Sequence, residues 1–118
     1  MKTADRIKRA RKASLIRKTV AKLLANQALD DPQLQSLSIS RVDFNVDQSI
    51  CWIFFYSEQG EEHFNEKLEH LKLYKPSLRT AIAKEIPGKY VPEIVFRYDE
   101  QLKKQIAIEQ LLDTLKDQ

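Results

Sequence analysis

The stretch KLYKPSLRTAI, residues 72–82, decides how the middle of the chain folds. Hydrophobic residues at helical spacing precede it and follow it, and Pro76 stands where the two patterns meet. Because proline has no N–H and fits the first turn of a helix, the stretch predicts a junction between two consecutive helices. The first of these helices begins after Gly60. The predicted core positions of the pair are Phe64, Leu68, Leu71, Leu78, Ile82 and Ile86.

Strand patterns lie on both sides of this helix pair. Apolar residues alternate from 37 to 46, and the alternation slips by one position at Ser40-Arg41, which predicts a β-bulge. The polar turn NVDQS then leads into ICWIFFY, residues 50–56, so the two runs form a predicted hairpin. After the helix pair, EIVFRYD at 93–99 predicts a third strand.

Helices are predicted at both ends of the chain. Residues 5–28 have an apolar stripe that ends before DDP at 30–32. The stripe consists of Ala13, Ile16, Val20, Leu23, Leu24 and Ala28. A C-terminal helix carries Leu102, Ile106, Ile108, Leu111, Leu112 and Leu115. The order is α-β-β-α-α-β-α, an α+β domain spanning residues 1–118, with 1–4 and 116–118 expected as disordered ends.

The second strand has two apolar faces. Cys51, Ile53 and Phe55 share one face, and Trp52, Phe54 and Tyr56 share the other. Either the strand is buried on both sides, or the aromatic face is open for stacking or for contact with a partner.

Charge is distributed unevenly along the chain. Residues 1–22 carry nine basic residues and one acidic residue, whereas the remaining 96 residues have a net charge of −5. Residues 72–89 have a net charge of +4, and residues 58–69 a net charge of −4. A dense basic block is typical of a surface that binds a polyanion, although a solvated helix face has the same composition.

The sequence favours a soluble protein of the cytoplasm. Its longest apolar run has seven residues, too few to cross a bilayer, and its single cysteine cannot form an internal disulfide. Residues 2–24 have the composition of a mitochondrial transit peptide. We expect them to be retained, because their helix supplies core residues.

Little in the sequence predicts catalysis. His63 and His70 lie about two helical turns apart, too far to ligate one metal ion unaided, and are expected on the surface. Cys51 has no evident histidine partner and is expected in the core. We therefore predict no catalytic residue, no metal, no cofactor and no small-molecule substrate.

The predicted order of elements is that of type II KH domains, which bind single-stranded nucleic acid through a Gly-x-x-Gly loop. The chain has only two glycines, Gly60 and Gly88, so this loop is absent. The stretches DDPQL at 30–34 and KYVPEIVFRYDEQL at 89–102 resemble elements of the ribosome-binding factor A family, which has a KH fold without that loop. The resemblance extends over residues 13–115.

This resemblance implies a monomeric, non-catalytic factor with three strands and helices on one face. It implies binding to the 30S subunit and 16S rRNA, with a role in late maturation and in processing of the rRNA 5′ end. The basic charge of the first helix and of the junction indicates the RNA-binding surface, whose predicted residues are Arg6, Lys8, Arg9, Arg11, Lys12, Arg17, Lys18, Lys72, Lys75, Arg79, Lys84 and Lys89. Two alternatives stay open: a general single-stranded RNA binder that stacks bases on Trp52, Phe54 and Tyr56, and a protein-interaction module that dimerises through this face.

The junction departs from the family pattern. Where the family usually has an Ala-x-Gly kink between two helices, this chain has Tyr74-Lys75-Pro76. Proline can impose by steric restriction the bend that glycine permits by its freedom. We expect an interhelical kink here, with Tyr74 adding bulk where RNA would approach.

Overall fold

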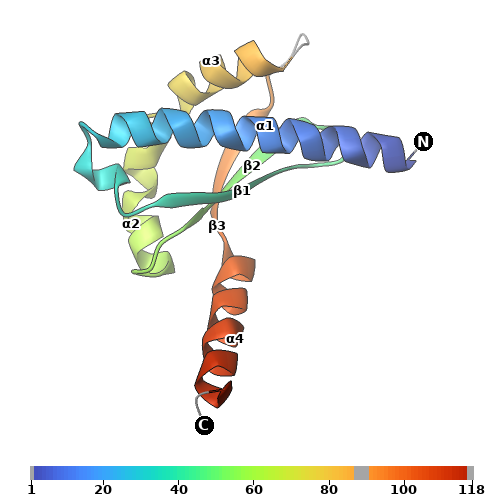
Figure 1. Ribbon diagram of the computed structural model, residues 1–118. Coiled ribbons are helices and arrows are strands. Elements are labelled where there is room, and N and C mark those ends of the chain that lie inside the picture. The colour runs from blue at the N-terminus through green and yellow to red at the C-terminus, as the bar shows by residue number, and fades with distance from the viewer. Residues whose placement is uncertain (1, 87–90, 117–118) are drawn as a thin grey trace.

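The computed structural model describes residues 2–86 and 91–116. Its elements are α1 (Lys2–Ala28), the short 3-10 helix η1 (Pro32–Leu34), β1 (Ser38–Phe44), β2 (Ile50–Tyr56), α2 (Glu61–Lys72), α3 (Lys75–Glu85), β3 (Glu93–Tyr98) and α4 (Glu100–Lys116) (Figure 1). The predicted order of four helices and three strands is confirmed. Residues 2–4, expected as part of a disordered end, lie in α1, and residue 116 ends α4.

The three strands form one mixed sheet in the order β1-β2-β3. β1 and β2 are the predicted antiparallel hairpin, with the bulge between Ile39 and Arg41. Gln48 in the hairpin turn has a φ of 60°, in the left-handed region. β2 and β3 run parallel, and the helix pair α2–α3 supplies the crossover that parallel strands need.

The core lies between one face of this sheet and the first three helices. From β2, the residues Cys51, Ile53 and Phe55 are buried, as the alternation predicted. Their register partners on β3 are Ile94, Phe96 and Tyr98, also buried. The helices contribute Ile16, Val20, Leu24, Phe64, Leu71, Leu78 and Ile82 to the same cluster. This apolar contact holds α1, α2 and α3 on one face of the sheet.

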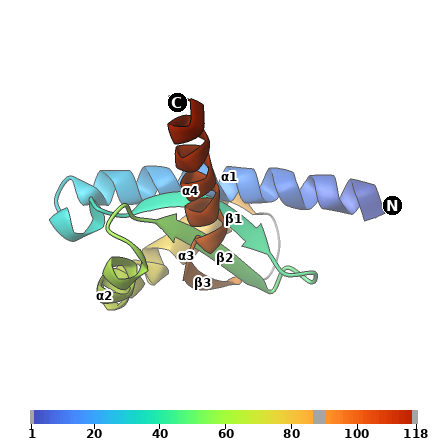
Figure 2. The ribbon, with the colours of Figure 1, turned by 90° about the horizontal axis from the view of Figure 1, so that it is seen from below.

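The opposite face of the sheet carries the aromatic residues of β2. Trp52 and Phe54 are half-buried and do not belong to the core cluster. The guanidinium carbon of Arg41 lies 3.8 Å from the ring centroid of Phe54, and that of Arg97 lies 5.7 Å from Trp52. The core-forming helices α1, α2 and α3 lie on the other face, and α4 is the helix that projects from this side of the sheet in the view from below (Figure 2). The structure supports an open face at Trp52 and Phe54, whereas Tyr56, the third residue of that face, packs against the core cluster and stacks on Tyr98.

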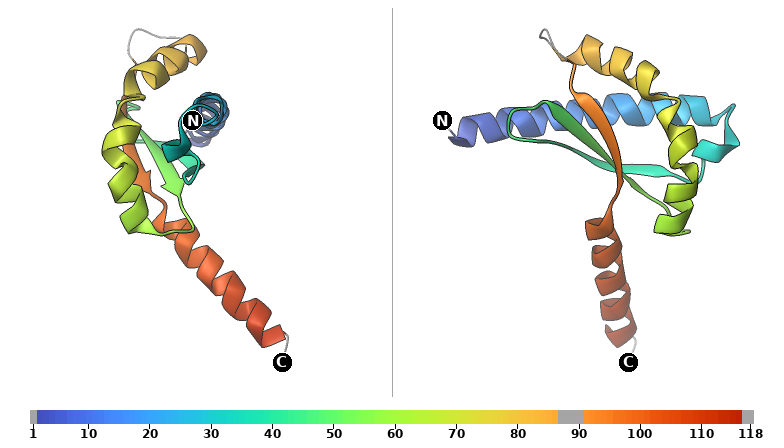
Figure 3. Two further views of the ribbon diagram at one scale, coloured as in Figure 1. Left: turned by 90° about the vertical axis from the view of Figure 1, so that its left-hand side faces the viewer. Right: turned by 180° about the vertical axis from the view of Figure 1, so that it is seen from behind.

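Helix α4 departs from the one-faced arrangement of the other helices. It extends away from the sheet (Figure 3), and it has no buried residue. Ile108, Leu111, Leu112 and Leu115 are 53% to 61% exposed. The expectation of helices on one face therefore holds for α1, α2 and α3, while α4 presents an apolar stripe that is not covered by the described part of this chain.

Asp99 fixes the base of α4 to the bulge in β1. The residue is 2% exposed, and its Oδ1 accepts a hydrogen bond of 3.0 Å from the Leu102 N–H, which caps the helix. Its Oδ2 accepts from the Ser40 hydroxyl at 2.7 Å and from the Arg41 Nε at 3.3 Å. Because a bulge places two successive residues against one partner, both Ser40 and Arg41 reach the carboxylate.

These contacts set the protonation of Asp99. Burial raises its pKa, but the hydrogen bonds from Ser40 and Leu102 and the charge of Arg41 outweigh burial and hold the pKa below the ordinary value. A lowered pKa in the folded state adds stability above the pKa of the unfolded chain. This stability is lost as the pH falls through the folded-state pKa.

Replacing Asp99 by Asn should therefore destabilise the fold at pH 7. We expect a loss of about 1–3 kcal/mol, because hydrogen bonds to a charged group are replaced by bonds to a neutral amide. The loss should shrink as the pH falls through the folded-state pKa of Asp99, which lies below the ordinary value, because the parent carboxyl then becomes protonated too. Urea unfolding at pH 7 and at a series of acidic pH values measures the loss, and a loss that increased as the pH fell would contradict the assigned charge.

Candidate nucleic-acid interface

The predicted basic residues of α1 lie between positions 6 and 18 of a helix that spans residues 2–28. Five of the predicted residues are exposed, whereas Arg9 and Lys12 are half-buried. The exposed set is Arg6, Lys8, Arg11, Arg17 and Lys18. The first turns of α1 extend past the β1–β2 hairpin (Figure 1), so that this part of the helix is accessible from several sides.

Two of these basic residues also anchor α1 to the sheet. Lys12 Nζ donates a hydrogen bond of 2.7 Å to Gln48 Oε1 in the hairpin turn. Arg17 Nε donates one of 3.2 Å to the Ser40 carbonyl at the bulge. These contacts position the projecting basic segment. The other exposed basic residues of the predicted set on α1 are not among these two anchors: Arg6, Lys8, Arg11 and Lys18.

The second basic group lies on α2 and α3. Arg79 and Lys84 are exposed, and Lys72 pairs with Glu69 at 3.0 Å. Lys75 is half-buried, with its Nζ 5.5 Å from the Phe96 ring centroid. The predicted residue Lys89 lies outside the described residues. Within this group, Arg79 and Lys84 are the cations best placed to meet a ligand.

α3 packs beside the C-terminal half of α1, so that the basic group on α3 lies next to the end of the basic block of α1. Leu78 and Ile82 of α3 share the core cluster with Val20 of α1. A groove between the two helices is lined by Lys22 of α1, by Leu29 just after that helix, and by Glu85 of α3. Lys22 was not among the predicted site residues, although it is the last cation of the basic block in residues 1–22 and lies on the same helix.

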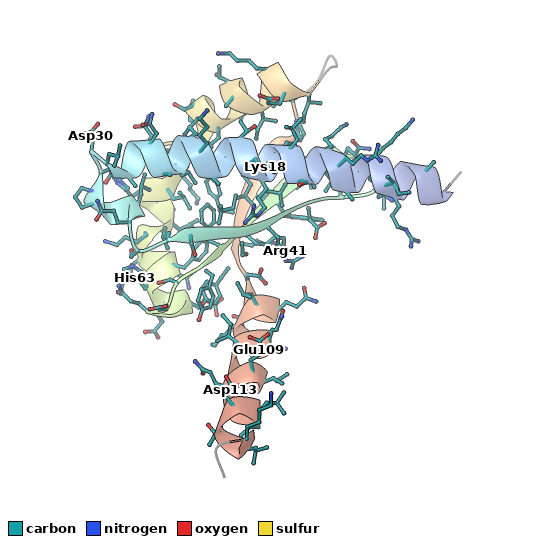
Figure 4. All side chains as sticks on the ribbon, in the orientation of Figure 1. Lys18, Asp30, Arg41, His63, Glu109 and Asp113 are labelled. Carbon is teal, nitrogen blue, oxygen red and sulfur yellow. The ribbon has the colours of Figure 1, made fainter. Side chains whose placement is uncertain are left out.

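Acidic residues lie along α4 as well as in the groove itself, where Glu85 stands on α3. In Figure 4, the labelled Lys18 and Arg41 lie on α1 and β1, whereas Glu109 and Asp113 lie out along α4. Arg41 is held by carboxylates, with its Nη1 2.8 Å from Asp43 Oδ2. The open sheet face therefore offers less free positive charge than α1 does.

The interhelical junction has the predicted break, but Tyr74 does not lie as expected. α2 ends at Lys72, and Pro76 lies in the first turn of α3, as predicted. Tyr74 is half-buried, and its hydroxyl donates a hydrogen bond of 2.5 Å to Asp31 Oδ2. The expectation that its bulk faces an approaching RNA is not supported by this orientation.

The two histidines also differ from their predicted places on the surface. Both are half-buried and hydrogen-bonded to the segment between α1 and β1. His63 Nε2 lies 2.6 Å from the Ser36 hydroxyl, and His70 Nε2 lies 2.5 Å from Asp31 Oδ2. Hydrogen bonds from Tyr74 and then from His70 lower the pKa of Asp31. Both histidines thus join α2 to this loop.

The geometry offers little to a catalytic mechanism. Burial, with a smaller effect of Asp43, raises the pKa of the Cys51 thiol to about 12, so that the thiol stays protonated. Residues 2–86 and 91–116 contain no group of three side chains suited to hold a metal ion. In the same residues, no helix is both long enough and apolar enough to span a bilayer.

Comparison with known proteins shows which family this chain resembles. The family model of ribosome-binding factor A matches residues 8–112. The chain belongs to the ribosome-binding factor A family. A family member from Prochlorococcus marinus strain MIT 9301 is 33% identical over 109 residues, which cover 92% of this chain and 84% of the relative. Another family member, from Rhodopseudomonas palustris strain BisB5, is 32% identical over 111 residues. The match covers 91% of this chain and 79% of that relative.

Solved structures of the family have the same fold. The crystal structure of ribosome-binding factor A from Thermus thermophilus superposes with a TM-score of 0.59 at 24% sequence identity. The match covers 75% of this chain and 92% of the Thermus protein. The α+β, KH-like architecture predicted from the order of elements is thereby confirmed. The family is named for ribosome binding and not for a catalysed reaction.

Proposed function

We propose that this protein binds the free or immature 30S subunit through 16S rRNA in the cytoplasm. There it promotes late small-subunit maturation and processing of the rRNA 5′ end, acting as a monomer without catalysis. The observation that carries the proposal is the exposed basic segment of α1, in a chain whose family is named for ribosome binding. Each phosphate that a basic side chain neutralises releases condensed counterions, which favours binding to rRNA.

The arrangement of the two basic groups supports recognition of RNA shape. Arg11 and Lys18 project from α1, and Arg79 and Lys84 from the adjacent α3. Lysine and arginine contacts to phosphates position a protein on RNA without reading its bases. Two helices at a fixed spacing can therefore select a folded rRNA element by the geometry of its backbone.

The open aromatic face favours a second function. Trp52 and Phe54 are accessible, and α4 adds the apolar stripe of Ile108, Leu111 and Leu112. Such surfaces are typical of protein contacts. A module that dimerises through them is the alternative, and sedimentation equilibrium at micromolar concentration decides it. The proposed function predicts the mass of one chain, whereas the alternative predicts twice that mass.

Replacing Arg79 and Lys84 together by Ala should weaken binding to purified small subunits. We expect an affinity loss of about tenfold at moderate salt, and a salt slope smaller by roughly one phosphate contact per lost charge. The measurement is fluorescence anisotropy of the labelled protein titrated with small subunits between 50 and 200 mM salt, and large subunits serve as the competitor of similar charge.

The matched control for this prediction is the double replacement of Lys103 and Lys104 by Ala. These residues are exposed on α4, and their removal changes the net charge by the same amount. The control should bind as the parent does. Equal losses in the two variants would mean that binding follows net charge and not the basic group on α3.

A further inference from the structure

One carboxylate joins three separate parts of the fold. Asp31 lies between α1 and η1, and its Oδ1 accepts a hydrogen bond of 3.2 Å from the Gln33 N–H. Its Oδ2 accepts from the Tyr74 hydroxyl, at the start of α3, and lies 2.5 Å from His70 Nε2, in the last turn of α2. The end of α1 is thus tied to both sides of the α2–α3 junction.

The side chains in this cluster pack together and remain partly exposed to solvent. Asp31, His70 and Tyr74 are all half-buried, and the His70 and Tyr74 rings pack edge to face with centroids 6.0 Å apart. Tyr74 also packs against the core cluster through its ring. A carboxylate that receives hydrogen bonds from several elements restricts the relative movement of those elements.

The junction is otherwise held by core packing on both sides, through Leu71 and Leu78, and by local backbone hydrogen bonds. Tyr74 precedes the first residue of α3 and provides no side-chain cap for that helix. Leu73 and Tyr74 separate the two helices, and their N–H groups bond back to the carbonyls of His70 and Leu71. The described segment 61–86 has no glycine, so the direction of α3 cannot depend on a glycine conformation.

We propose that Tyr74 and His70 are positioning residues for the RNA surface. Through Asp31 they help the core packing of α3 to fix the direction in which that helix leaves α2, and so they hold Arg79 and Lys84 beside the C-terminal half of α1. The effect on binding rests on the proposed function, whereas the effect on the junction does not. Tyr74 acts on the ligand through α3 and makes no contact with RNA itself.

Replacing Tyr74 by Phe tests this role, because the ring and its packing remain and the hydroxyl is lost. Hydrogen exchange of the free protein is measured by mass spectrometry on peptides spanning 29–36 and 70–80. We expect exchange in these peptides to rise about tenfold, with peptides from β2 and β3 unchanged. Affinity for small subunits should fall about three- to tenfold.

The matched control is Tyr98→Phe. The Tyr98 hydroxyl donates a buried hydrogen bond of 3.1 Å to the Ser57 carbonyl, away from the junction. This variant loses one tyrosine hydrogen bond and should lower the melting temperature, but it should leave exchange in 70–80 and the affinity unchanged. A purely structural role of Tyr74 would make the two variants behave alike, and that result would overturn the proposal.

A double-mutant cycle of Tyr74→Phe and Asp31→Asn isolates the effect of the hydrogen bond between the Tyr74 hydroxyl and the Asp31 carboxylate. We expect the effects on exchange in 70–80 to be clearly less than additive, because either replacement alone weakens the same contact. Additive effects would contradict the role of Asp31 as the common acceptor. If the parent protein failed to bind small subunits, the proposed function would be lost, while the exchange data would still decide whether Tyr74 holds the junction.

Discussion

Replacing Lys8, Arg11 and Lys18 together by Glu should reduce the affinity for small subunits by about two to three orders of magnitude at moderate salt. Each replacement turns an attractive charge into a repulsive one, and the salt slope should fall by about one unit for each lost phosphate contact. All three side chains are exposed on α1, so the fold should be retained. Titration with purified small subunits and a circular dichroism melt measure the two effects.

The control for this variant carries the same charge change on α4. Lys103, Lys104 and Lys116 are exposed there, and their replacement by Glu lowers the net charge equally. We expect this control to lose less than about tenfold, through long-range repulsion alone. If the α1 variant bound small subunits as tightly as the parent does, the RNA surface could not be assigned to that helix.

The adjacent residues Phe54 and Phe55 should respond very differently to replacement by Ala. Phe55 is 1% exposed, and its ring centroid lies 6.0 Å from that of Phe64 and 5.6 Å from that of Phe96. Its truncation should cost about 3–5 kcal/mol of unfolding free energy, because a cavity opens in the core. Phe54 lies on the open face under Arg41, and its truncation should cost about 1 kcal/mol or less.

Urea unfolding of the two variants measures this difference directly. A similar large loss in both would mean that something covers the aromatic face in solution, such as a second copy of the chain. In that case the loss for Phe54 should depend on protein concentration, which the same experiment repeated at a tenfold dilution would reveal.

Local periodicity predicted the strands and the bulge well. The slip of alternation at Ser40-Arg41 marked the bulge because side chains in a strand alternate strictly between faces, so one extra residue is visible in the sequence. The same alternation separated buried Phe55 from half-buried Phe54. The sequence could not show that the aromatic face stays uncovered, since this depends on where α4 goes.

The local sequence pattern could not predict the direction of α4, and the reason is physical. An amphipathic sequence shows that a helix has an apolar side, but not which surface that side meets. Here the direction follows from the bonds between Asp99 and the bulge residues Ser40 and Arg41, which lie 59 and 58 positions earlier in the chain. Those bonds became visible only with the fold.

At the α2–α3 junction, too, local sequence patterns could not predict contacts between residues that are distant in the chain. The proline break in residues 72–82 was predicted from the chain itself, whereas the partner of Tyr74 was not. Asp31 lies 43 positions before Tyr74 and 39 before His70, so nothing in the neighbouring sequence indicated the contact. Charge composition likewise identified the basic block but could not separate Lys12, which bonds to Gln48, from exposed Arg11.

Sedimentation of a cell extract through a sucrose gradient tests the central claim most directly. The account predicts that the protein travels with free small subunits, that it moves to the top of the gradient at high salt, and that the variant with Glu at positions 8, 11 and 18 stays at the top in moderate salt. A parent protein that stayed at the top at low salt, or that was spread equally over small and large subunits, would contradict the account.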